Sequence, residues 1–274
     1  MSYELKPGGS YRMPLSFGEA PGARNVPAHV ALDHSRFPDI SRFTVRFRTD
    51  PELLDRILPP GMVLAGEPIV TLYFATMKRI QWLAGRDYNV LSFSFPARFK
   101  GERDDVTGQF KAALWEGLPD PVVSGREDLG FPKLWCELPE PRYLDGRHSF
   151  EASWLGFRLF EAEFIEGEDV AKLPPVPGEA ACSGTICHKY VPRSGERGVA
   201  DLDQLIYWPQ FAAANVARAN IGTGSFRFNR ARWEDLPTMH HVVNVLADLP
   251  VEIIRSDMVW ASGQGDVSNL QILR

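Results

Sequence analysis

The sequence predicts a mainly β protein with a few short helices, arranged as an antiparallel barrel or cone. Runs in which apolar and polar residues alternate follow one another along most of the chain after residue 40, and this pattern is typical of half-buried strands. Strands do not alternate with long helices, so parallel βαβ units are not expected. We see no internal repeat and no linker. We therefore expect a single domain over residues 1–274, in which residues 1–40 are an irregular N-terminal arm.

The first elements follow from local patterns. Residues 1–40 are rich in Gly, Pro and Ala without a sustained period, which favours an arm that runs over the surface or onto a neighbouring subunit. Apolar residues alternate with polar ones over 43–48, as in a half-buried strand. Asp50 and Pro51 then supply a helix N-cap and a first-turn proline. A short amphipathic helix is expected over 53–58.

The rest of the chain reads as short strands joined by loops. A charged hairpin tip is expected over 100–108 and a short alanine-rich helix over 211–219. Proline, glycine and charged residues separate the apolar runs, as they do between strands. The expected strands are 69–75, 91–96, 115–123, 150–154, 157–164, 183–190, 202–208, 226–230 and 251–261.

Composition excludes several classes of protein. Lys and Arg number 30 against 35 Asp and Glu, and no basic run appears, so a nucleic-acid partner is not expected. No stretch of 18 apolar residues predicts a membrane span, and the N-terminus does not resemble a signal peptide. Three cysteines give no disulfide framework, and the Cys182-x4-Cys187 spacing is not that of a zinc site. We expect a cytoplasmic protein without a metal.

One lysine lies in unusual surroundings. Lys133 follows Phe131-Pro132 and precedes Leu134-Trp135. Apolar neighbours remove solvent from an ammonium and favour the neutral amine, which attacks carbonyl groups and forms Schiff bases. The alternative is a lysine whose stem is buried while its ammonium stays in water. The residues by themselves leave both open.

The block Gly125–Lys133 resembles the signature of the acetoacetate decarboxylase family. In that family the lysine after Tyr/Phe-Pro forms the Schiff base, and acetoacetate decarboxylase is a known case of a lysine activated by its surroundings. The similarity extends, with weaker motifs, over about residues 43–267. The resemblance implies a β-cone fold, a homo-oligomer, no cofactor, and Lys133 as the reactive amine.

The chain also departs from the family pattern. Leu134 stands where decarboxylases carry a second lysine. Tyr73 and Tyr88-Asn89-Val90 stand where two acidic residues are expected. The amine would then be activated by desolvation alone. These departures fit relatives that run pyruvate aldolase-dehydratase or hydratase-type reactions better than acetoacetate decarboxylation.

The resemblance suggests roles for further residues. Tyr73, Tyr88 or Glu127 is expected to transfer protons, although Glu127 equally suits a structural partner of Arg126 or of backbone amides. An arginine is expected to bind the substrate carboxylate through its bidentate fork. The residues expected around the substrate are Arg42, Arg46, Arg98, Arg126 and Phe131.

Three functions remain open from the sequence. The preferred one is a cofactor-independent lyase that acts on a small oxo acid, with or without an aldehyde co-substrate. Within this class, aldol or dehydration chemistry is preferred over decarboxylation of acetoacetate. The third is a barrel that binds a small molecule without reacting with it.

Overall fold

The computed structural model describes residues 4–23, 25–31, 39–209, 215–263 and 269–274. The strands are β1 Asp39–Arg48, β2 Met62–Leu64, β3 Ile69–Ile80, β4 Arg86–Lys100, β5 Asp105–Glu116, β6 Lys133–Trp135, β7 Arg142–Leu144, β8 Arg147–Trp154, β9 Phe157–Asp169, β10 Gly184–Pro192, β11 Ala200–Pro209, β12 Asn215–Phe228, β13 Glu252–Ser262 and β14 Gln271–Ile272. The helices are α1 Pro51–Asp55, α2 Pro119–Ser124 and α3 His240–Ala247, with short turns η1 Leu15–Phe17, η2 Gln81–Leu83 and η3 Gly125–Leu129.

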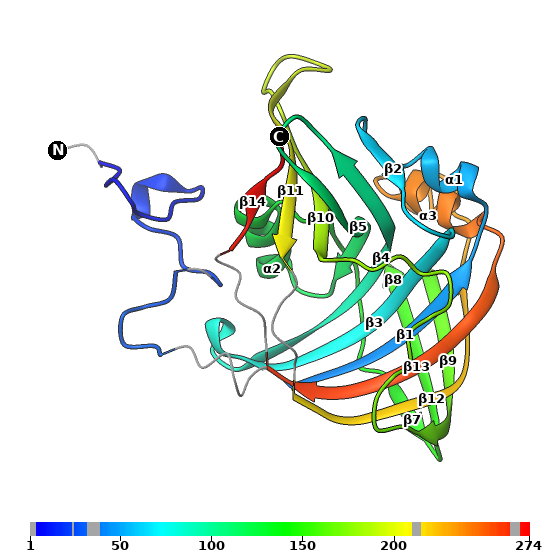
Figure 1. Cartoon of the computed structure of the whole chain (residues 1–274). Helices are drawn as coiled ribbons and strands as arrows, with labels where there is room; N and C mark the ends of the chain where they lie inside the picture. The colour runs from blue at the N-terminus through cyan, green and yellow to red at the C-terminus, as the bar shows by residue number, and fades with distance from the viewer. Residues whose placement is uncertain (1–3, 24, 32–38, 210–214, 264–268) are drawn as a thin grey trace.

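These strands form one strongly curved sheet. Its order is β14-β11-β10-β5-β4-β3-β1-β13-β12-β9-β8-β7, and β2 and β6 pair with β4 and β5 at the side of this path. All pairs are antiparallel except β10 with β5 and β5 with β6. The mainly β, mainly antiparallel prediction is therefore confirmed. Among the described residues the sheet stays open between β14 and β7, and the long strands curl round as in a cone (Figure 1).

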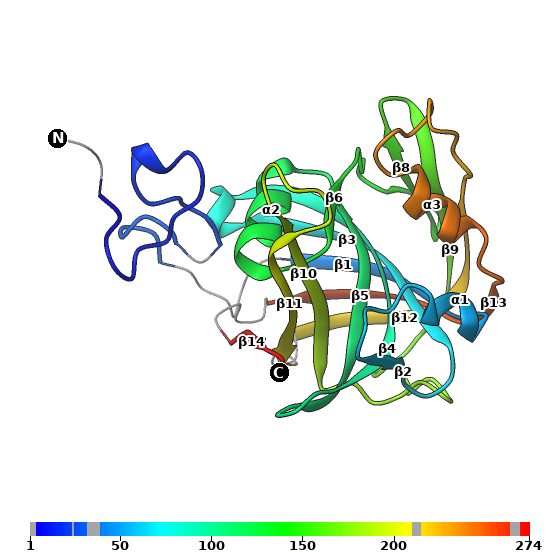
Figure 2. The same cartoon turned by 90° about the horizontal axis from the view of Figure 1, so that it is seen from above.

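The two faces of the sheet differ in character. Phe43 pairs with Phe74, and both side chains enter the main hydrophobic core together with residues of α1 and α3. The neighbouring positions Arg42 and Tyr73 point to the opposite face, because strand side chains alternate. The α2–η3 segment lies over that face, where it lines a cavity together with both of these side chains. In Figure 2, α2 lies on the side of the sheet toward the N-terminal arm, and α1 and α3 lie on the opposite side.

The first helix forms with the expected cap, but it spans Pro51–Asp55 and not 53–58. Asp50 caps α1 by accepting a hydrogen bond from the Glu52 backbone amide at 2.8 Å, and Pro51 lies in the first turn. By contrast, the strand expected over 115–123 is wrong beyond Glu116. The chain turns there into α2, whose first turn contains Pro119. A proline fits that position because its missing N–H would have no helical partner.

Two other local expectations fail. The alanine-rich helix over 211–219 is wrong where the structure describes it, since Asn215 to Ala219 begin β12; residues 211–214 lie outside the described ranges. Strand β4 continues through Pro96 to Lys100 instead of ending there, and the charged loop shortens to 101–104. In β4, pairing with β5 on one side and β2 on the other overrides the strand-ending tendency of Pro96.

The described part of the N-terminal arm has little regular structure beyond η1. It extends away from the sheet at the end where α2 lies (Figure 1). Arg12 ties it to the body, because its Nη1 lies 2.6 Å from Asp128 Oδ2 in η3. The arm also places Ala23 against the cavity described next.

Candidate active site

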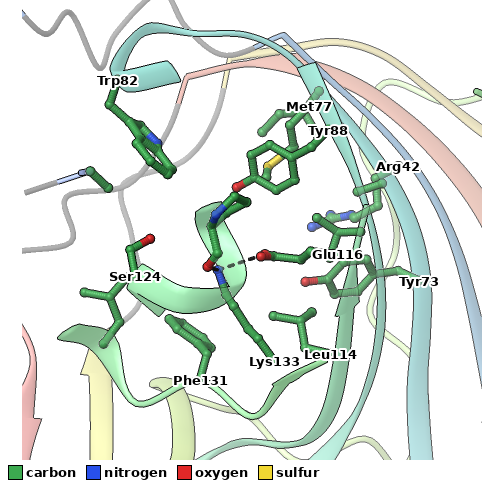
Figure 3. A pocket seen from close by; sticks show the side chains of 16 residues that line it. Arg42, Tyr73, Met77, Trp82, Tyr88, Leu114, Glu116, Ser124, Phe131 and Lys133 are labelled. Carbon is green, nitrogen blue, oxygen red and sulfur yellow. Dashed lines mark hydrogen bonds and ion pairs between the residues drawn. The ribbon is translucent and has the colours of Figure 1, made fainter. Parts of the chain in front are cut away.

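A cavity of about 250 Å³ lies on the face of the sheet that carries Arg42 and Tyr73. Strands β3, β4 and β5 form its wall, and α2, η3 and Phe131 close the side opposite them. Buried Leu114, Val90 and Ala75 supply apolar wall, while Lys133 and a few polar groups point inward (Figure 3). Such a mostly apolar cavity with few polar groups is typical of a small-molecule site.

Local backbone geometry delivers Lys133 into this cavity. Gly130 ends η3 with φ of 78°, a left-handed conformation that favours glycine. Lys133 then begins β6, which runs parallel to β5 with Lys133 opposite Leu114. Leu134, next along the strand, packs against the main core. The motif therefore works as a turn followed by a strand that aims one side chain inward.

The Lys133 amine is buried and has two close polar partners. The residue is 8% exposed. Its Nζ lies 2.8 Å from Glu116 Oε1 and donates to the Pro121 carbonyl at 3.0 Å (Figure 3). The Phe131 ring lies on another side, 5.6 Å from its centroid to Nζ. Lys133 and Glu116 are therefore in direct contact inside the protein, close enough for a proton to pass between them.

Glu116 is the acid that the sequence analysis did not find. It is the last residue of β5 and only 2% exposed. Burial raises the pKa of its carboxyl, and Lys133 lowers it only in part. Its Oε2 has no hydrogen-bond partner among the described residues, so one oxygen remains for a bound molecule. Tyrosines stand at the two positions where acidic residues were expected, and the carboxylate beside the lysine comes from a different strand, β5.

Two tyrosines face the cavity, and their phenol pKa values are shifted in opposite directions. Burial is the largest influence on Tyr73 and by itself raises the phenol pKa. Nearby Lys111 outweighs it together with Ser92 and Arg42, so the pKa of Tyr73 is lowered overall. Tyr88 lies on the neighbouring strand. Burial, and then the charges of Glu116 and Tyr73, raises the pKa of Tyr88 well above its ordinary value.

Three of the four candidate arginines occupy different places. Arg42 lines the cavity, with its guanidinium carbon 5.9 Å from the Tyr73 ring centroid. Arg46 lies outside it, in ion pairs with Asp257 at 3.1 Å and Glu179 at 3.3 Å. Arg98 lies on the exposed β4–β5 hairpin, paired with Asp105. Only Arg42 of the three lines the cavity.

Of the motif residues around Lys133, one lines the cavity and two lie outside it. Phe131 lines the cavity and stacks on Trp208 with ring centroids 5.4 Å apart. Arg126 and Glu127 are exposed and do not line it. Arg126 Nη1 donates to the Lys133 carbonyl at 2.9 Å, and the Glu127 carbonyl accepts a hydrogen bond from Lys189. Both therefore hold the turn in place from outside the cavity.

The described residues contain no cluster of three or more His, Cys, Asp or Glu side chains placed to hold a metal ion. None of the described helices is long and apolar enough to cross a membrane. The polar groups that line the cavity are a lysine, a carboxylate, two phenols, a hydroxyl and a guanidinium. This set suits acid–base and amine chemistry.

Comparison with known proteins places this geometry in a family. The family model of acetoacetate decarboxylase (ADC) matches residues 12–261. Among curated proteins, acetoacetate decarboxylase 1 of Bradyrhizobium diazoefficiens is 37% identical over 98 residues, which are 36% of this chain and 36% of that protein. The matched segment thus spans about a third of that relative's length.

Solved structures share the fold over nearly the whole chain. A structure of acetoacetate decarboxylase has a TM-score of 0.68 at 17% identity and covers 89% of this chain and 91% of its own. The enduracididine biosynthesis enzyme MppR complexed with pyruvate has a TM-score of 0.67 at 17% identity and covers 98% and 99%. The same enzyme complexed with the condensation product of pyruvate and imidazole 4-carboxaldehyde also has a TM-score of 0.67, at 18% identity over 98% and 97%. With a family model matched over residues 12–261, this chain belongs to the acetoacetate decarboxylase family.

Proposed function

We propose that this protein is a lyase that forms a Schiff base between Lys133 and the ketone of a small oxo acid, and that its reaction is of the pyruvate aldolase-dehydratase or hydratase type. The observation that carries the proposal is the buried contact of 2.8 Å between Lys133 Nζ and Glu116 Oε1 inside a cavity. A buried amine with an adjacent proton acceptor is the arrangement that carbonyl condensation requires.

The pair supplies the proton transfers of condensation. Glu116 takes a proton from the Lys133 ammonium, and the freed amine attacks the ketone carbon to form a carbinolamine. Glu116 then returns the proton to the carbinolamine hydroxyl, which leaves as water while the nitrogen lone pair forms the iminium bond. Burial raises the pKa of Glu116 above its ordinary value, which favours the acid form that this return step uses.

Arg42 is the residue in the cavity that suits the substrate carboxylate. Within the described residues no carboxylate pairs with it, so its guanidinium keeps its donors for a ligand. A guanidinium binds a carboxylate through two parallel hydrogen bonds. Tyr88 suits a proton donor, because its raised pKa keeps the phenol protonated. Met77 and Trp82 extend the apolar wall and leave room for an aldehyde beside the enamine.

The fold of MppR, which is similar to this one, has been solved with pyruvate and with a condensation product of pyruvate and an aldehyde. That likeness supports an oxo acid and an aldehyde as the substrate class to test here. Decarboxylation of acetoacetate is the second candidate, and it is favoured by the 37% identity to a curated acetoacetate decarboxylase over 98 residues. The two reactions share the iminium and differ in the bond that breaks next.

The test is reductive trapping. The protein is mixed with pyruvate or acetoacetate, treated with borohydride and weighed intact. We expect a mass increase that is lost in Lys133→Ala and kept in Lys78→Ala, a matched lysine on β3 that lies outside this cavity. Absence of an adduct with any small oxo acid would overturn the proposal and favour a barrel that binds without reacting.

The two candidate reactions are separated in a second measurement. Wild-type protein is supplied with acetoacetate alone, or with pyruvate and an aldehyde, and both carbon dioxide and conjugated product are followed. We expect conjugated product from the pyruvate and aldehyde mixture. Rapid carbon dioxide release from acetoacetate without that product would assign decarboxylation instead.

A further inference from the structure

A second buried lysine lies on the cavity side of the sheet, beside Tyr73. Lys111, on β5, is 7% exposed. Its Nζ donates to Ser92 Oγ at 2.8 Å and lies 4.8 Å from the centroid of the Tyr73 ring. Neither the motif around Lys133 nor the proposed condensation uses it. A buried ammonium is costly unless a neighbouring group compensates its charge.

No carboxylate among the described residues forms an ion pair with Lys111. The carboxylates of the interior are already engaged elsewhere: Glu116 with Lys133, and Asp257 with Arg46 and with Arg255. The phenol of Tyr73, whose ring centroid lies 4.8 Å from Lys111 Nζ, is a group able to carry a negative charge. Ser92 is next to both groups: its hydroxyl accepts from Lys111, and Ser92 contributes with Lys111 to lowering the pKa of Tyr73.

The Tyr73 phenol therefore lies between cations on two strands. Arg42 approaches its ring from β1 and Lys111 from β5. The remaining titratable groups that face this part of the cavity come from β4, β5, β6 and β10. They are Tyr88, Glu116, Lys133 and Cys187. Glu116 is held by Lys133, and burial raises the pKa of both Tyr88 and Cys187, so these two stay neutral.

We propose that Lys111 is a positioning residue that holds Tyr73 as a phenolate, and that this phenolate moves the proton on the substrate carbon next to the iminium. The proposal rests on the Schiff base at Lys133. In the forward step the C–H bond breaks, its electron pair forms the enamine double bond, the iminium electrons return to nitrogen, and the proton joins the phenolate oxygen. In reverse, Tyr73 returns the proton to the carbon.

This arrangement divides the proton work between two sites. Glu116 serves the nitrogen and the departing water, and Tyr73 serves the carbon. The two groups are held in different places: Glu116 lies 2.8 Å from the Lys133 nitrogen, whereas Tyr73 lies beside the two cations of the wall. Two flanking cations stabilise a phenolate as a nearby opposite charge stabilises any ionised group, and the pKa of Tyr73 is lowered accordingly.

The first test needs no substrate. The ultraviolet absorbance of tyrosinate is titrated in wild type, Tyr73→Phe and Lys111→Met, and the curve of Tyr73→Phe is subtracted from the wild-type curve to isolate Tyr73. We expect the isolated transition below that of an ordinary tyrosine, and shifted upward by at least one pH unit in Lys111→Met. An unshifted transition in Lys111→Met overturns the proposal, whatever the protein does with oxo acids.

The second test follows the proton itself. Wild type and variants are incubated with pyruvate in heavy water, and deuterium entering the methyl group is measured across pH beside borohydride trapping. We expect Lys111→Met to trap pyruvate as wild type does but to exchange at least tenfold more slowly near neutrality. The rise of its exchange rate with pH should occur at higher pH than in wild type. Tyr73→Phe should lose exchange throughout.

Rescue separates positioning from packing. Lys111→Arg keeps the cation and is expected to restore the wild-type pH limb, with a rate within about threefold. Ser92→Ala keeps the lysine, tests the hydroxyl next to both groups, and serves if Lys111→Met does not fold. Exchange with a wild-type pH profile in Lys111→Met or Ser92→Ala contradicts the proposal. Failure of wild type to trap any oxo acid would instead overturn the Schiff-base function.

Discussion

Gly125 shows how tightly the reactive lysine is enclosed. Its φ of −68° is one that any residue adopts, so the backbone does not require glycine here. A methyl group at this position would overlap Cδ, Cε and Nζ of Lys133. The glycine at the start of the motif therefore makes room for the lysine side chain. Gly125→Ala is predicted to displace the amine.

The size of the effect follows from the contacts that are lost. The displaced Nζ leaves Glu116 at 2.8 Å and the Pro121 carbonyl at 3.0 Å. Overpacking of this kind costs about 1–3 kcal/mol in the free energy of unfolding, and for a domain of this size about 2–4 °C in melting temperature per kcal/mol. A reacting group misplaced by about 1 Å loses about a hundredfold in rate.

The assay is the rate of borohydride-trapped adduct with pyruvate, together with thermal unfolding. Gly117→Ala is the matched control, because the nearest atom to an added methyl group there is 3.5 Å away, an ordinary contact. It should trap at the wild-type rate. A folded Gly125→Ala protein that traps pyruvate as fast as wild type would refute the claim that the enclosure fixes the amine.

Three further predictions concern the cavity. Burial raises the pKa of Glu116 and Lys133 lowers it only in part, so the folded protein binds this proton more tightly than the unfolded chain does. The free energy of unfolding should therefore fall as pH rises above 4.5, the ordinary pKa of a glutamate. Urea titrations of Glu116→Gln should show no such fall with pH. Arg42→Met should raise the pyruvate concentration for half-maximal trapping about ten- to hundredfold through loss of a charged hydrogen bond, whereas Arg98→Met on the exposed hairpin should leave it unchanged. Tyr88→Phe should slow product formation about tenfold or more without shifting the pH dependence of the rate, since a phenol kept protonated donates but does not titrate near neutrality. A shifted pH dependence would assign Tyr88 the role of base.

Much of the fold follows from local pattern. Alternation over 43–48 and 157–164 marks strands correctly because one face of each meets the core and the period of a strand is two. The failures occur where pairing or a turn overrides the pattern. Apolar residues after Glu116 continue as α2 because Pro119 starts a helix there, and residues 215–219 are extended because β12 pairs with β13.

Some residues of the candidate site were predicted from the sequence, and others were found only in the structure. Lys133, Phe131, Tyr73 and Tyr88 were found from the sequence, the first two from a contiguous motif and the tyrosines from the positions where acids were expected, and all four line the cavity. Glu116 was missed because no motif marks it. It reaches Lys133 only because β6 runs parallel to β5, with Leu114 opposite Lys133.

The sequence by itself determined the strand pattern and singled out one lysine behind a glycine, an aromatic residue and a proline, because these depend on neighbours in the chain; it left open whether that lysine is buried. Only the tertiary structure decided which groups meet that lysine. Lys111 and Leu114 are three residues apart, so a regular strand would place them on opposite faces. An irregularity in pairing between Phe93 and Ser94 puts one extra residue in β5 and brings both to the side of the cavity.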